Sequence, residues 1–251
     1  MDLELKGRTA LVTGASSGIG RGVARLLALE GVRVAGAARR VDRIEALSRE
    51  VEAEGGAPIV ALAYDLYEDD AAERLAADAL AALGTVDVLM NVAGASRPIP
   101  FDAPREAWAE GMTLNFFRLR ELTHALVPQM RERGFGRIVN VTGTSEPRML
   151  NAAFTAKAAV HVWSKGLSRE VARDGVTVNC LQPGRIHSEQ ILKRYPTAEA
   201  EREYAEAEIP MARFGEPEEI GAVAVFLASA RAAYVTGTVI PVDGGSSRFA
   251  F

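Results

Sequence analysis

Three glycines follow a short apolar segment near the N-terminus. Residues 9–13 are all apolar or threonine, and Gly14, Gly18 and Gly20 come directly after them. At this spacing the first glycine permits a tight turn, the second lets backbone amides approach a pyrophosphate, and the third permits close helix packing. The positive end of the helix that we expect to begin near Ile19 attracts the anion. The expected dinucleotide contacts in this turn are Gly14, Ser16, Ser17, Gly18, Ile19 and Gly20.

Two arginines stand after the next apolar segment. Dinucleotide sites place a carboxylate there to bind the ribose hydroxyls of NAD, whereas an arginine accommodates the extra phosphate of NADP. This chain has Arg39 and Arg40 and no acid between them and the segment. Because a guanidinium can grip a phosphate with two hydrogen bonds, the pair predicts NADP(H) as cofactor in preference to NAD(H). The alternative is that both arginines are solvated surface residues.

Elements of two kinds must position these residues. Short apolar segments alternate with longer ones rich in Ala, Leu, Glu and Arg, the pattern of a parallel sheet. The expected strands are residues 9–13, 32–37, 59–63, 86–91, 137–142, 176–181 and 238–243. We therefore expect one α/β domain over residues 1–251, a doubly wound Rossmann-type fold of about seven parallel strands flanked by helices. The irregular insertion 185–210 is the expected substrate lid.

Composition excludes several classes of partner. The chain has 251 residues, 48% of them hydrophobic, enough for one sizeable core. Its net charge of −4 provides no positive field for nucleic acid or an anionic membrane. Without a leader or a long apolar stretch, the sequence predicts a cytoplasmic protein with a small-molecule partner. Cys180 is the only cysteine and the three histidines are scattered, so neither an internal disulfide nor a metal site is expected.

Further motifs extend the nucleotide-binding pattern along the chain. They are Asp65-Leu66, Asn91-Val92-Ala93-Gly94, Asn115, Lys157 and the run Pro183-Gly184-Arg185-Ile186-His187-Ser188. With these motifs and the glycine turn, the chain resembles the short-chain dehydrogenase/reductase family from Gly7 to Gly245, including its 3-oxoacyl-(acyl-carrier-protein) reductases.

The resemblance implies a role for each motif. Lys157 would hold the nicotinamide ribose, Asn115 would support a proton-relay water, and Asp65 would contact the adenine. It also implies a homotetramer, or a dimer, in which the long helices after the fourth and fifth strands pack across subunits. Besides the turn and the two arginines, the implied cofactor-binding residues are Asp65, Leu66, Asn91, Ala93, Gly94, Lys157, Pro183, Gly184, Ile186 and Ser188.

The chain departs from the family at the proton donor. Hydride transfer to a carbonyl leaves an alkoxide that needs a proton, and the family supplies it from a tyrosine four residues before the lysine. Ala153 stands there, and the adjacent Phe154 carries no hydroxyl. The family's carbonyl-binding serine falls at Gly143, which leaves Thr144 or Ser145 as substitutes. The expected catalytic residues are Lys157, Asn115, Ser145 and Thr144.

Two functions remain open on these residues. The first is an NADP(H)-dependent oxidoreductase that acts on a carbonyl or secondary alcohol with a proton donor other than tyrosine. The second is a non-catalytic nicotinamide-dinucleotide-binding protein, a sensor or a structural subunit. His187, Tyr195 and Tyr204 are further candidate donors, although lid packing is the commoner role for such residues.

Overall fold

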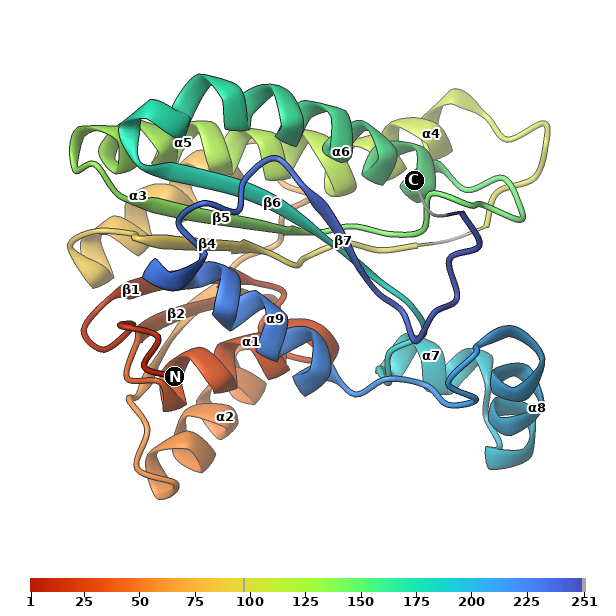
Figure 1. Ribbon diagram of the computed structural model, residues 1–251. Helices are drawn as coiled ribbons and strands as arrows, with labels where there is room; N and C mark the ends of the chain where they lie inside the picture. The colour runs from red at the N-terminus through yellow and green to blue at the C-terminus, as the bar shows by residue number, and fades with distance from the viewer. Residues whose placement is uncertain (97, 250–251) are drawn as a thin grey trace.

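A parallel sheet forms the central layer of the protein. Figure 1 shows the computed structural model, which describes residues 1–96 and 98–249. Over these residues seven parallel strands lie in the order β3-β2-β1-β4-β5-β6-β7, which confirms the predicted Rossmann-type fold. They are β1 (Thr9–Thr13), β2 (Arg33–Ala38), β3 (Ile59–Ala63), β4 (Val88–Asn91), β5 (Gly136–Val141), β6 (Val176–Pro183) and β7 (Val239–Val242).

The strand order determines where a ligand can bind. All five residues of β1 and all six of β5 are buried, as expected for strands covered on both faces. The order reverses between β1 and β4, and in such sheets ligands bind at the carboxyl ends of the strands at the point of reversal. Gly14 directly follows β1, and residues 92–94 directly follow β4. The topology therefore brings these two motifs together.

Helices cover both faces of the sheet (Figure 1). On one face lie α1 (Gly18–Leu29), α2 (Val41–Ala53) and α9 (Pro217–Ala228). On the other face lie α3 (Ala71–Leu83), α5 (Arg118–Glu132) and α6 (Ala152–Val171). Each set packs its apolar stripe on the sheet, so two cores form, one on either side.

Shorter elements complete the chain. The helix α4 (Arg105–Met112) continues through the π-helical segment η1 (Thr113–Phe117) into α5, and the 3₁₀ turns η2 (Ala172–Asp174) and η3 (Ala230–Ala232) each precede a strand. The predicted lid 185–210 contains α7 (Glu189–Arg194) and α8 (Ala198–Glu208), which lie at one end of the molecule (Figure 1). In the described part of the chain, every helix is too short or too polar to cross a membrane.

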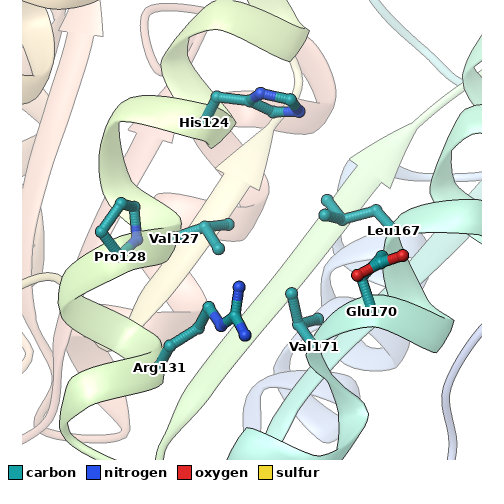
Figure 2. Close-up of a pocket in the computed structure, with 7 residues that line it drawn as sticks. All are labelled: His124, Val127, Pro128, Arg131, Leu167, Glu170 and Val171. Atoms are coloured by element: carbon teal, nitrogen blue, oxygen red, sulfur yellow. The ribbon is translucent and has the colours of Figure 1, made fainter.

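The outer surface of α5 and α6 is hollowed. Figure 2 shows this shallow cavity, whose lining residues are His124, Val127, Pro128 and Arg131 from α5 and Leu167, Glu170 and Val171 from α6. On α6, the apolar side chain of Val162 is 77% exposed. These are the two helices that the family resemblance implies at a subunit contact. The oligomeric state itself stays a prediction.

Candidate active site

The glycine turn has the conformation that the sequence predicts. Gly14 and Gly18 have φ of 73° and 52°, a region that favours glycine. A Cβ on Gly20 would stand 2.2 Å from the carbonyl oxygen of Gly14, so only glycine lets α1 begin this close to β1. The side chain of Ser17, at the N-cap position, does not cap the helix. The N-terminal end of α1 thus faces the cleft with room for an anion.

The residues after β4 lie beside the glycine turn and form the other side of the cleft. Thr13 Oγ1 accepts hydrogen bonds from the amides of Val92 (3.0 Å) and Ala93 (3.1 Å), which fixes residues 92–94 beside Gly14. A Cβ on Gly14 would lie 3.1 Å from Ala93 Cα. Asn91 is buried instead, and its amide donates to Thr123 and Asn140 within the core. Asn91 therefore ties β4 to its neighbours and does not line the cleft.

Arginines and tyrosines surround the end of the cleft where the sequence predicts the adenosine of the cofactor. Arg40 Nη2 donates to Ser17 Oγ at 3.2 Å, which places its guanidinium beside the glycine turn. Arg39 Nη1 lies 3.9 Å from Asp65 Oδ2. Tyr64 and Tyr67 also line this end, and the sequence reasoning did not identify them. An arginine near the turn with no competing acid on β2 is the arrangement predicted for the extra phosphate of NADP.

Lys157 lies at the inner end of the cleft. Its Nζ donates to the carbonyl oxygens of Val141 (3.1 Å) and Thr142 (3.2 Å) at the end of β5. Removal of the ammonium from water lowers the pKa of Lys157 to about 8. The N-cap residue Asn151 accepts from Ala153 N at 2.9 Å and so fixes where α6 begins. The lysine consequently has a fixed position and a proton that it can release near neutral pH.

Asn115 lies in the π-helical segment η1, a kind of helical irregularity that is frequent at functional sites. Its Nδ2 donates to the carbonyl oxygens of Gly111 (2.9 Å) and Ala95 (3.1 Å), whereas its buried Oδ1 has no partner. A Cβ on Gly94 would stand 2.7 Å from Asn115 Oδ1 and 3.4 Å from Lys157 Nζ. Both polar atoms therefore lie against Gly94, and Asn115 keeps an acceptor available for a water or ligand.

The hydroxyls of the loop after β5 have other partners. Ser145 Oγ donates to Gln182 Oε1 at 2.8 Å, and Thr144 Oγ1 accepts from the amide of Glu146. The Glu146 carboxylate accepts in turn from the amides of Arg248 (2.9 Å) and Phe249 (3.2 Å) in the C-terminal segment. Neither Thr144 nor Ser145 is among the described residues that line the cleft. Their proposed contact with a carbonyl stays a prediction.

Most of the predicted cofactor residues share one cleft. Gly184 does not line it, and a Cβ there would stand 2.7 Å from Asp243 Cα, so this glycine serves close packing. The predicted residues that do line it are Gly14, Ser16, Ser17, Gly18, Ile19, Gly20, Arg39, Arg40, Asp65, Leu66, Ala93, Gly94, Lys157, Pro183, Ile186 and Ser188.

The further candidate donors belong to the lid. Tyr195 and Tyr204 pack against each other and against the buried Phe214. His187 Nε2 lies 2.7 Å from Glu201 Oε1, and its Nδ1 lies 2.8 Å from Glu216 Oε1. Because ionised carboxylates only accept hydrogen bonds, both contacts form together only when the imidazole carries both protons.

We predict that His187 stabilises the lid in a pH-dependent way. Burial lowers the pKa of His187, but the hydrogen bonds to Glu201 and Glu216 outweigh it and leave the pKa raised. A group with a raised pKa contributes fully to the stability of the fold below about pH 6.5, the pKa of a free imidazole. This contribution is lost as the pH rises through the pKa of the group in the folded protein. His187→Gln should lower Tm by about 2–4 °C near pH 6, with the difference fading toward pH 9.

His124→Gln is the matched control for this pH dependence. Burial, followed by the charge of Arg120, lowers the pKa of His124. The difference in Tm between wild type and His124→Gln should therefore not shrink as the pH rises. A difference in Tm between wild type and His187→Gln that is equal near pH 6 and pH 9 would contradict the prediction.

Comparison with known proteins identifies the family. The sequence model of the family described as Enoyl-(Acyl carrier protein) reductase matches residues 14–247. The chain belongs to the short-chain dehydrogenase/reductase family. This membership accounts for the glycine turn, Asn115 and Lys157 together, and makes the chain an oxidoreductase of short-chain dehydrogenase type.

Individual relatives match the chain over nearly its whole length. Nodulation protein G of Rhizobium sp. (strain N33) is 39% identical over 96% of this chain and 98% of its own. A 3-oxoacyl-[acyl-carrier-protein] reductase of Vibrio cholerae is 35% identical over 97% of this chain and 98% of its own. The L-sorbose reductase of Gluconobacter frateurii, solved with NADPH and L-sorbose, has a TM-score of 0.94 at 30% identity, covering 99% and 100% of the two chains.

Proposed function

We propose that the protein is an NADP(H)-dependent oxidoreductase that interconverts a carbonyl and a secondary alcohol, with Lys157 in place of a tyrosine as the proton source. The observation that carries this proposal is that Lys157 Nζ and Asn115 Oδ1 both lie close to Gly94, which lines the cleft together with Lys157. When bound, NADPH would supply the hydride. Lys157 would hold the ribose and protonate the alkoxide, directly or through a water on Asn115.

The cleft fits a dinucleotide. Three of its lining residues are glycines that could not carry a side chain. A Cβ on Gly14 or Gly20 would meet backbone atoms, and one on Gly94 would meet the polar atoms of Asn115 and Lys157. Among the charged residues that line the cleft, Lys157 lies beside Gly94 at one end, whereas Arg39, Arg40, Asp65 and Glu189 lie toward the other end. The charge pattern therefore supports a phosphate-bearing adenosine at one end and proton transfer at the other.

The cofactor preference is tested by Arg40→Ala. Charge-assisted hydrogen bonds between guanidinium and phosphate contribute about 1.5–3 kcal/mol, so the dissociation constant of NADPH should rise about 10- to 100-fold. That of NADH should stay within about twofold, because NADH lacks the extra phosphate. Titration of nucleotide fluorescence measures both constants. Arg25→Ala removes the same charge from α1, away from the cleft, where Arg25 pairs with Glu54, and should affect neither.

The reaction itself is tested with purified protein, NADPH and a panel of ketones, β-ketoesters and quinones, by following absorbance of the reduced cofactor. Oxidation with any of them supports the proposal. NADPH binding without turnover on the whole panel would instead favour the second function, a non-catalytic dinucleotide-binding protein. Ala153 at the position of the family tyrosine is the observation that keeps this second function open. We also propose a homo-oligomer formed through α5 and α6, which sedimentation of the purified protein would test.

A further inference from the structure

A carboxylate from the lid occupies the arginines at the adenosine end of the cleft. Glu189 is the first residue of α7. Arg40 Nη1 lies 2.9 Å from Glu189 Oε2 and 3.1 Å from Oε1, and Arg43 forms a further ion pair with the same carboxylate. Glu189 is separated in sequence from Arg40 by 149 positions and from Arg43 by 146. The contact therefore joins the start of α2 to the start of α7 across the opening of the cleft.

Neighbouring contacts extend this bridge. Gln190 Nε2 donates to the carbonyl oxygen of Ser96 at 2.8 Å, on the β4 side of the cleft. Ser188 Cβ lies 3.1 Å from the point where a Cβ on Gly18 would stand. Residues 188–190 thus lie over the glycine turn, held at one side by arginines and at the other by a backbone carbonyl. Ser188, Glu189 and Gln190 also line the cleft, so a bound cofactor would lie beside them.

The Glu189 carboxylate can be replaced on the two arginines by a phosphate. Hydrogen bonds from Arg40 and then Arg43 lower the pKa of Glu189, so it is a carboxylate at neutral pH. The side chains of Arg40, Arg43 and Glu189 are 40%, 45% and 44% exposed, and an ion pair so exposed is weak. A phosphate dianion carries more charge and more acceptor oxygens than a carboxylate and also pairs with guanidinium.

We propose that Glu189 is a cofactor-selective latch, which holds Arg40 and Arg43 in the free protein and yields them to the 2′-phosphate of NADP(H). The inference rests on the proposed NADP(H) site and adds to it a specificity-determining residue on the lid. NAD(H), with two ribose hydroxyls at this place, has no group that can displace the carboxylate. The lid would therefore respond to the phosphate that distinguishes the two cofactors.

Glu189→Gln tests the latch because it keeps the shape of the side chain and removes its charge. The dissociation constants of NADPH and of the fragment 2′,5′-ADP should both fall about fivefold, as the arginines no longer have to be released. The constant of NADH should stay within about twofold. Glu50→Gln is the matched control, since Glu50 pairs with Arg21 outside the cleft, and should change none of the three.

The same titrations separate this inference from the proposed function. With Arg40 already replaced by alanine, Glu189→Gln should give less than about half of its effect on NADPH binding in the wild type. An equal tightening of NADPH and NADH, or no tightening at all, would overturn the latch while leaving the effect of Arg40→Ala intact. If Arg40→Ala itself fails to separate the two cofactors, both the proposed preference and the latch are wrong.

Discussion

Lys157→Met is expected to lower kcat for carbonyl reduction by about a thousandfold, within the range for loss of a general acid. The variant keeps an unbranched apolar stem of similar length and removes the ammonium that donates to Val141 and Thr142. Steady-state rates with NADPH and the best carbonyl of the panel give kcat, and nucleotide titration shows separately whether the cofactor still binds.

The pH profile gives an independent test of the same residue. Reduction needs the protonated lysine, and burial lowers its pKa to about 8. The rate of reduction should therefore fall as the pH rises through about 8, whereas oxidation of the alcohol, which needs the neutral amine, should rise over the same interval. Lys165→Met makes the same change two turns later on α6, where the side chain donates to Gly237 O at 3.1 Å outside the cleft. A Lys157→Met enzyme with more than about a tenth of the wild-type kcat would exclude Lys157 as the acid.

Ala153→Tyr is expected to raise kcat for reduction by about a hundredfold. Residues four apart lie on the same face of a helix, so the new phenol would stand one turn from Lys157 Nζ. The neighbouring ammonium would lower the pKa of the phenol toward the working range, and a positioned acid contributes about 10²–10⁴ in rate.

Ala153→Phe is the matched control because Ala153 is only 2% exposed, and any ring here requires its neighbours to move. If tyrosine and phenylalanine change kcat equally, the ring and not the hydroxyl is responsible. Thermal unfolding of both variants shows whether the fold accepts the ring. An unchanged kcat in a folded Tyr variant would mean that substrate does not approach α6 at this position.

The sequence predicts most of the fold because short apolar segments alternate clearly with longer segments of helical composition. The strand ends in the structure differ from the predicted ends by up to two residues, and the start of β4 shows why. Residues 86–91 are apolar enough to predict a strand, but Thr9 N donates to the carboxylate of Asp87 at 3.2 Å. The side chain of Asp87 thus takes the place of a backbone acceptor for Thr9 N, although the backbone of Asp87 still pairs with Thr9 and Arg137, and β4 begins at Val88. The helix α1 begins at Gly18, next to the predicted start near Ile19.

The site was predicted where its residues follow a local motif and missed where distant segments meet. The glycine turn could be found from its spacing, and Lys157 from the resemblance to the family. Asn91 belongs to a matching motif, yet burial among Thr123 and Asn140 directs its amide into the core. The pairing of Glu189 with the arginines has no local signal, because it depends on how the lid folds back over the turn.

The C-terminal segment has a consequence for how the site assembles. Glu146, in the loop that carries Thr144 and Ser145, is bonded to amides 102 and 103 residues further along the chain. Gln182 of β6 adds an indirect link, because it accepts a hydrogen bond from Ser145 Oγ and donates one to Ser247 Oγ at 3.3 Å. During synthesis, which proceeds from the N-terminus, this loop cannot make these contacts until residues 247–249 have left the ribosome. The nascent chain can therefore form the glycine turn and its neighbouring strands well before this loop has its final geometry.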